Sequence, residues 1–199
     1  MHSEEAILQG ALKLFAREGV AHVGTDEIAT AAGVNRTTLY RRFGSKQEVV
    51  NAATAYETAR VITQIETQLP QIPNSPDPSF DAAKYLVDFF TITHETLRTN
   101  KLIQRVLNSD QPSAILGLTL QSGPALATAT QILVDRISAV RRATGRYPDP
   151  DPYPVQSIAA TITRLHHSLL LSKAAPPTLD TRAERETYAT LAIVPLILT

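Results

Sequence analysis

Helical periodicity runs through nearly the whole chain and constrains the fold more than any other feature. Apolar residues recur at intervals of three and four in every long segment, and no segment sustains the alternation typical of a β-strand. Proline-rich stretches interrupt this pattern at Leu69–Phe80, Arg146–Pro154 and Ala174–Asp180, because proline cannot donate the backbone hydrogen bond that a helix or sheet needs. We therefore predict an all-α protein with loops at these three stretches.

The composition excludes several classes of protein. With 199 residues and 43% hydrophobic content, the chain can form one sizeable core or a small domain joined to a larger one. Cysteine is absent, which excludes disulfides and thiolate metal ligands. No apolar run approaches the ~20 residues that cross a bilayer, and the acidic N-terminus lacks the pattern of a secretory signal. We expect a cytoplasmic protein that has no membrane partner.

The formal net charge of the chain is zero. A protein that coats nucleic acid without sequence preference needs a basic surplus, so this class is disfavoured. A sequence-specific DNA-binding protein is compatible with zero net charge, because its positive charge can lie on one small face.

Cap and turn residues mark the ends of the predicted helices. Gly19 can close the first helix in a left-handed conformation, Asn35 and Ser45 can cap the third and fourth, and Pro195 should kink or end the last. The helices are predicted at about Ser3–Glu18, Thr25–Ala32, Asn35–Phe43, Ser45–Leu69, Ser79–Arg98, Asn100–Asn108, Pro112–Thr144 (interrupted near Ser122–Pro124), Pro154–Lys173 and Leu179–Leu198.

The second and third predicted helices are short and are joined by a tight turn at Gly33, which is the pattern of a helix-turn-helix. Leu39 and Phe43 would point to the core, and Thr37 and Arg41 would point nearly opposite. In such a motif the second helix enters the DNA major groove. The same pattern also occurs in helical proteins that bind no DNA, so spacing alone leaves both interpretations open.

Residue chemistry on the third predicted helix suits DNA. The Arg36 guanidinium can bond guanine O6 and N7, and Thr37 can contact a thymine methyl group. Phosphate oxygens, which position a helix without reading sequence, would be bound by Thr38, Tyr40, Arg42 and Lys46.

The order of residues in the first fifty or so positions helps to decide between the DNA-binding and the structural interpretation of this motif. The stretches "ILQGALKLFAREGV" and "DEIATAAGVNRTTLYRRFGSKQEVV" resemble the TetR family of bacterial one-component repressors. The resemblance covers about a quarter of the chain. It lies in Leu14, Phe15, Ala16 and Gly19, then Ile28, Ala29, Ala32, Gly33 and Val34, then Thr38, Leu39, Tyr40 and Phe43, and finally Lys46 and Val49.

This resemblance implies a DNA-binding domain at residues 1–48, with the helix-turn-helix at about 24–43, followed by a helical effector-binding and dimerisation domain at 49–199. Family members most often carry a hydroxyl residue where Gly24 stands, so Thr25 is expected to take over its cap and phosphate contact. Departures at Asn35, Thr37 and Arg42 mean that the operator sequence does not carry over. The implied DNA-binding residues are Thr25, Asn35, Arg36, Thr37, Thr38, Tyr40, Arg41, Arg42 and Lys46.

Family resemblance also implies that the last two predicted helices pair two subunits into a homodimer, which would present two recognition helices to a palindromic double-stranded operator. Burial within the same subunit is the alternative for their apolar residues. The candidate dimer-interface residues are Ile158, Ala159, Leu165, Leu169, Leu191 and Val194.

The helices between the DNA-binding domain and the last two predicted helices have a second implied function, the binding of a small-molecule effector. Tyr85–Leu97 and Ile115–Leu133 are apolar with interleaved Thr, Ser and Gln, which suits a neutral and mostly apolar ligand. Ordinary core packing is the alternative for the aromatic members. The candidate pocket residues are Phe89, Phe90, Thr93, His94, Leu120, Ile162 and His166.

No motif indicates an enzyme, a cofactor or a metal site. The sequence has no glycine-rich phosphate loop and no spacing of metal ligands, and the adjacent His166 and His167 would point to different sides of a helix. The sequence therefore favours a ligand-responsive transcriptional regulator, by family default a repressor. The alternative is a helical protein–protein interaction module whose helix-turn-helix is structural.

Overall fold

The computed structural model describes residues 4–108, 119–120, 122–147, 154–172 and 175–198. Throughout these residues the ordered elements are helices and no strand occurs, which confirms the predicted all-α class. The chain packs into two compact units. The first unit consists of Met1–Gln64 and Thr99–Asp110, and the second consists of Ile65–Arg98 and Gln111–Thr199. The functional division predicted at residue 48 stays a prediction.

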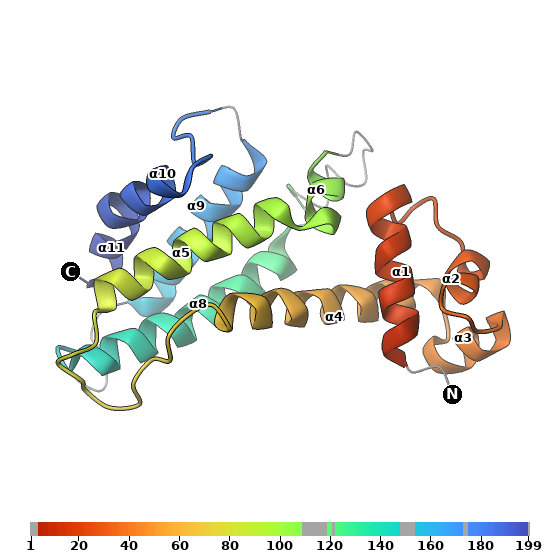
Figure 1. The fold of residues 1–199 in the computed structure, drawn as a ribbon, viewed down its shortest axis with the longest axis horizontal. Helices are drawn as coiled ribbons and strands as arrows, with labels where there is room; N and C mark the ends of the chain where they lie inside the picture. Colours follow the sequence, from red (N-terminus) through yellow and green to blue (C-terminus); the bar gives the residue numbers. More distant parts are fainter. Residues whose placement is uncertain (1–3, 109–118, 121, 148–153, 173–174, 199) are drawn as a thin grey trace. The chain divides into compact units, whose positions relative to one another are not determined.

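A small apolar core organises the first unit. Its helices are α1 (Glu4–Glu18), α2 (Thr25–Ala31), α3 (Arg36–Phe43), most of α4 (Lys46–Glu66) and α6 (Lys101–Leu107) (Figure 1). α1 packs against both α2 and α6, and α2 packs against α3. The buried core residues include Ile7, Phe15, Ile28, Leu39 and Val49.

Glycines and caps set the helix ends of the first unit largely as the sequence predicts. Gly19 ends α1 with a φ of 89°, which confirms the predicted left-handed closure, and Gly33 turns the chain after α2 with a φ of 66°. The Ser45 hydroxyl accepts a hydrogen bond from the Glu48 N–H at 3.2 Å, so the predicted cap of α4 is confirmed.

The expectation that Thr25 replaces Gly24 as the cap of α2 is wrong. Gly24 is itself the N-cap, and Thr25 is the first helical residue. The Gly24 N–H donates to the Glu27 carboxylate at 2.6 Å. A carboxylate three residues into the helix therefore satisfies the donor at a position whose own residue has no side chain.

A larger core organises the second unit. Its helices are α5 (Ala82–Thr99, whose last residue belongs to the first unit), α8 (Gly123–Thr144), α9 (Val155–Leu171), α10 (Arg182–Tyr188), the π-helical turn η1 (Ala189–Ile193) and α11 (Val194–Leu198). α8 packs along α9, as Figure 1 shows. The buried core residues include Tyr85, Leu86, Ile137, Val140 and Ile197.

Three predicted helix ends shift by three residues, and one of them is the start of α10, which lies at Arg182 rather than Leu179 because the Thr181 side chain caps the helix. α5 begins at Ala82 rather than Ser79, because the Asp77 carboxylate bonds Ser79 in a turn and the Asp81 carboxylate accepts from the Lys84 N–H at 2.9 Å. α4 ends at Glu66 rather than Leu69. The predicted helix start at Pro112 lies outside the described residues.

The predicted kink or end at Pro195 takes a different form. The last helix continues through η1 into α11, and the Val194 N–H donates to the Ala189 carbonyl five residues back. Proline lacks an N–H, and its ring crowds the carbonyl four residues earlier. The wider π turn accommodates this residue without ending the helix. No helix in the described part of the chain is long and apolar enough to cross a membrane.

Candidate nucleic-acid interface

A narrow apolar contact holds α3. Leu39 is fully buried in the core of the first unit, and Val34 and Phe43 are partly buried against the same core. The Asn35 side chain caps the helix by accepting a hydrogen bond from the Thr38 N–H at 2.7 Å. Three apolar residues and one cap therefore fix α3 and leave the rest of its surface free.

The predicted DNA-binding residues lie on this free surface and beside it. The first turn of α3 contains no acidic residue, and its last turn carries two arginines. The exposed members are Asn35, Arg36, Thr37, Arg41 and Arg42, and the half-buried members are Thr25, Thr38, Tyr40 and Lys46. This surface presents guanidinium, hydroxyl and amide donors with no apolar covering, which is the chemistry that phosphates and base edges require.

Four polar side chains form a cluster across α2 and α3, here named the Arg36 cluster: Thr25, Asp26, Arg36 and Tyr40. Arg36 Nη1 lies 3.2 Å from Asp26 Oδ2, and Arg36 Nη2 donates to the Tyr40 hydroxyl at 3.5 Å. The Tyr40 hydroxyl is 3.3 Å from Thr25 Oγ1. The Arg36 guanidinium carbon lies 5.3 Å from the centre of the Tyr40 ring.

These contacts shift two pKa values in the Arg36 cluster. The hydrogen bond with Thr25, followed by the one with Arg36, lowers the pKa of the Tyr40 phenol. The hydrogen bond to Tyr40, followed by the charge of Asp26, raises the pKa of Arg36. Arg36 is therefore held as a cation, with an acceptor on each of two guanidinium nitrogens.

Asp26 is not among the residues that the sequence predicts for this site. Asp26 and Arg36 are ten positions apart in the chain, and only the packing of α2 against α3 brings them together. The available signal was an acidic residue inside a motif whose other functional side chains are neutral or basic.

Residues 7–53 match a family model described as bacterial regulatory proteins, tetR family. The N-terminal part of the chain therefore belongs to the TetR family. The chain is similar to an uncharacterised helix-turn-helix transcriptional regulator of Mycobacterium tuberculosis, with 28% identity over 193 residues that cover 97% of this chain and 84% of that protein. The chain is accordingly a helix-turn-helix transcriptional regulator of the TetR family.

Solved structures of regulators, among them one of the TetR family, share the fold over nearly the whole chain. The repressor AlkX from Dietzia sp., implicated in n-alkane biodegradation, is 20% identical with a TM-score of 0.62, and the match covers 96% of this chain and 93% of AlkX. The fatty acid degradation regulator FadR from Bacillus halodurans is 14% identical with a TM-score of 0.58, and the match covers 95% of each chain.

Two of the effector residues predicted for this TetR-family chain form a stacked histidine pair in the second unit. His94 Nδ1 and His166 Nε2 are 3.1 Å apart, and Phe90 stacks on both rings. Burial, then the charges of Arg98 and Arg185, lowers the pKa of His94 to about 4. Burial, then His94, lowers the pKa of His166 to about 3. Both rings are therefore neutral at pH 7 and share one hydrogen bond.

The other predicted effector residues lie in different surroundings. Phe90 and Ile162 are buried in the core of the second unit, and Phe89 is partly buried against it. The Thr93 hydroxyl is buried and has no hydrogen-bond partner in the part of the chain that the structure describes. Leu120 is 86% exposed. The described residues contain no group of three or more His, Cys, Asp or Glu that could hold a metal ion.

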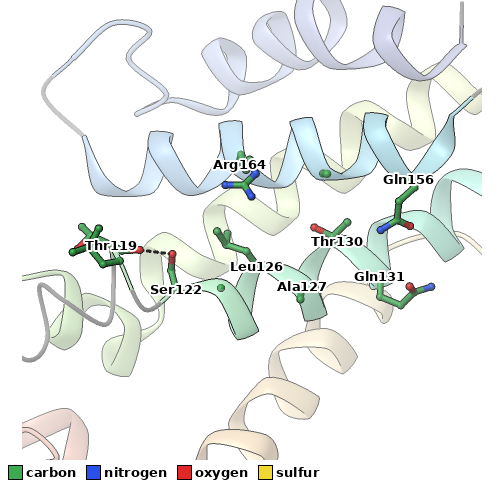
Figure 2. A pocket seen from close by; sticks show the side chains of 11 residues that line it. Thr119, Ser122, Leu126, Ala127, Thr130, Gln131, Gln156 and Arg164 are labelled. Atoms are coloured by element: carbon green, nitrogen blue, oxygen red, sulfur yellow. Dashed lines mark hydrogen bonds between the residues drawn. The ribbon is translucent and has the colours of Figure 1, made fainter.

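A groove of about 550 Å³ lies between the N-terminal half of α8 and α9 (Figure 2). Its lining combines small residues and two leucines with hydroxyls, amides and one guanidinium. The Ser122 hydroxyl is occupied, since it donates to the Thr119 carbonyl at 2.7 Å. The lining residues are Thr119, Leu120, Ser122, Gly123, Leu126, Ala127, Thr130, Gln131, Gln156, Ala160 and Arg164. Of the predicted effector residues, Leu120 is the one that lines this groove.

The predicted dimer-interface residues differ in exposure within the single subunit. Ala159 is fully buried in the core of the second unit. Leu191 lies on η1 and is 73% exposed. The half-buried residues, which pack against the core from outside, are Ile158, Leu165, Leu169 and Val194.

Proposed function

We propose that this TetR-family regulator is a repressor that binds a palindromic operator as a homodimer and leaves the operator when a small-molecule effector binds. The observation that carries the proposal is the surface of α3. One buried leucine, Leu39, anchors the helix, while Arg36, Thr37, Arg41 and Arg42 stay exposed.

The first step is the reading of DNA by α3. In a helix-turn-helix, the N-terminal residues of the second helix approach base edges in the major groove. Arg36 and Thr37 occupy the first turn of α3 and are exposed, so they are the proposed base-reading residues. Tyr40, Arg42 and Lys46 then bind phosphates, which fix the register of the helix on the duplex.

The second step is dimerisation through the last helices. One recognition helix contacts only a few base pairs, and a pair of them about one DNA turn apart gains affinity and selects a palindrome. Three leucines of the second unit support an interface there, because they are large, apolar and exposed: Leu171 at the end of α9, Leu191 on η1 and Leu196 on α11.

The third step is effector binding in the groove between α8 and α9. Leu120 and Leu126 supply apolar surface, and Thr130, Gln156 and Arg164 supply polar groups. This lining is more polar than the sequence led us to expect. It suits a ligand with an apolar body and several hydrogen-bonding atoms. Such a ligand releases DNA only if it binds the DNA-free conformation more tightly than the DNA-bound one.

DNA binding is tested with a palindromic fragment from the protein's own promoter region. The wild type should bind with an affinity that falls steeply as salt rises. Replacing Arg36 with Ala should cost about 1–3 kcal/mol of binding free energy and relax the preference at one position of each half-site. A helical interaction module would not bind the fragment at all, and that result would end the proposal.

Dimerisation is tested by Leu191→Glu, which should shift the protein to a monomer in light scattering. Leu120→Glu is the matched control, because it changes an equally exposed leucine of the same unit outside the proposed interface and should leave the oligomeric state unchanged. If the Leu191→Glu protein stays dimeric, the dimer interface does not include Leu191 and must lie elsewhere on the protein.

Effector release is tested by adding compounds that raise the melting temperature of the protein and measuring operator affinity. Arg164→Ala should weaken release by such a compound while leaving ligand-free operator affinity unchanged. Arg142→Ala removes an exposed arginine of α8 that does not line the groove, and it should behave as wild type. A compound that binds tightly at saturation without changing operator affinity would contradict the coupling.

A further inference from the structure

We propose that Asp26 positions the Arg36 guanidinium for hydrogen bonding to guanine, and so acts as a specificity-determining residue although it carries the wrong charge for DNA. This inference rests on the proposed function of α3. It adds Asp26 on α2 to the residues that determine DNA sequence preference. Unlike the surrounding cations, Asp26 would act without attracting DNA itself.

Asp26 contacts one terminal nitrogen of the Arg36 guanidinium, and Tyr40 contacts the other. Asp26 Oδ2 lies 3.2 Å from Arg36 Nη1, and the Tyr40 hydroxyl accepts from Arg36 Nη2 at 3.5 Å. Thr25 Oγ1 lies 3.3 Å from the Tyr40 hydroxyl and can donate to it, which leaves the Tyr40 O–H available. Each of the two contacts uses one N–H of its guanidinium nitrogen. The second N–H on each nitrogen and the Nε–H stay available for a base.

The solvent exposure of the Arg36–Asp26 ion pair limits its contribution to folding stability. The side chains of Arg36 and Asp26 are 59% and 70% exposed, and pairs of this kind contribute little to folding stability. A structural role for the pair is therefore weak. Its effect lies in the orientation of Arg36, because a free arginine side chain samples many rotamers and loses that freedom when it binds.

Bidentate bonding to guanine needs the guanidinium plane in the plane of the base. A guanidinium whose two terminal nitrogens already have hydrogen-bond partners meets this requirement with less loss of conformational freedom. Phosphate contacts have a looser requirement, since the exposed oxygens of a phosphate can be approached from several directions, whereas the guanine edge fixes one plane. Asp26 should therefore help Arg36 at guanine and hinder it at phosphate, where the carboxylate repels the backbone and neutralises the guanidinium.

The two consequences have opposite signs, which makes the inference testable. Loss of the Asp26 charge should weaken binding to an operator that carries guanine opposite Arg36, by about threefold to tenfold. The same change should strengthen binding to unrelated duplex DNA, by about twofold. A residue that acts only through its charge would strengthen both, and a residue needed for folding would weaken both.

The experiment measures the affinity of the full-length protein for two duplexes by fluorescence anisotropy at one salt concentration. One duplex is the operator obtained by selection, and the other has the guanine assigned to Arg36 replaced by adenine in both half-sites. The variants are Asp26→Asn, Asp26→Ala and the conservative Asp26→Glu. The control is Glu48→Gln, which removes an exposed carboxylate of the first unit that makes no contact with Arg36 among the described residues.

The ratio of the two affinities should fall in Asp26→Asn and fall further in Asp26→Ala, with partial recovery in Asp26→Glu. Glu48→Gln should leave the ratio unchanged. In an Arg36→Ala background, Asp26→Asn should no longer lower the ratio, because the residue acts through Arg36. Melting temperatures within a few degrees of wild type confirm that the variants fold.

An unchanged ratio in Asp26→Asn and Asp26→Ala, with Arg36→Ala still losing affinity, would overturn this inference and leave the proposed function standing. A wild-type protein that does not distinguish the two duplexes, or an Arg36→Ala protein that binds as wild type, would instead contradict the proposed reading of DNA by α3.

Discussion

The two units of this protein place their polar side chains in opposite ways. In the first unit the polar side chains of α3 face outward around an apolar core, and Glu57 and Asn100 form a buried polar pair away from α3. In the second unit charged and polar groups lie inside. Arg141 is 2% exposed and donates to the Ile197 carbonyl at 2.9 Å, and Arg185 is buried and donates to the Leu179 carbonyl at 2.9 Å.

This difference has a physical consequence for each unit. Outward-facing donors with few internal partners are available to a macromolecule such as DNA. The buried arginines of the second unit donate to backbone carbonyls. A buried charge without such partners would be strongly unfavourable. The first unit should therefore tolerate changes to the exposed polar residues of α3 and be sensitive to changes in its apolar ones. The second unit should be sensitive to both.

The largest expected effect comes from the anchor of α3. Leu39→Ala removes a fully buried side chain and should cost about 2–5 kcal/mol of unfolding free energy. Hydrogen exchange followed by mass spectrometry should show faster exchange in α1–α4, with α8 and α9 unchanged. Equal acceleration in both units would break the comparison, since it would mean that they unfold as one.

A smaller effect is expected from the buried histidine pair of the second unit. An unfolded histidine has an ordinary pKa of 6.5, whereas the pKa of His94 in the folded protein is about 4. Below pH 6.5 the unfolded chain binds more protons, so stability is full above that pH and falls as the pH drops toward 4.

The loss from His94 alone should reach roughly 3 kcal/mol across this range, because its pKa differs by about 2.5 units between the two states and each unit is worth about 1.4 kcal/mol. Urea unfolding at several pH values measures this slope for the wild type and for the double variant His94→Gln, His166→Gln. The variant should have a flatter slope, and the wild-type loss should show as faster exchange in α5 and α9. Identical slopes in the two proteins would contradict a neutral buried pair.

The smallest of these effects concerns a polar residue of the first unit. Asn35→Ala removes the cap on the Thr38 N–H and should cost about 1 kcal/mol of unfolding free energy. Asn35→Ser keeps a capping oxygen and should cost a few tenths. Thermal unfolding separates the two, and a cost for Asn35→Ala as large as that for Leu39→Ala would contradict the distinction between anchor and surface.

Local signals explain why the sequence predicts the first unit well. Asn35 and Ser45 cap the helices that they precede, and Gly19 closes the helix that it follows. Each of these interactions spans four residues or fewer, so the pattern of the chain contains them. An interaction of the same local kind occurs at Asn100, whose side chain caps α6 by accepting from the Ile103 N–H at 3.0 Å.

Long-range packing explains what the sequence did not predict. The Asp26–Arg36 pair depends on the angle between α2 and α3, and the contact between His94 and His166 joins residues 72 positions apart. The groove along α8 and α9 depends on the packing of two helices that are separated by a proline-rich stretch. Helical periodicity determines which side of a helix is apolar, but it does not determine which helices meet.

The most direct test of the central claim, that the exposed face of α3 reads duplex DNA, is selection of bound sites from a random duplex library. The account predicts a palindrome whose half-sites lie about one helical turn apart, with enriched guanine that disappears when the selection is repeated with Arg36→Ala. Failure to enrich any sequence, or the same enriched motif from the wild type and from Arg36→Ala, would contradict it.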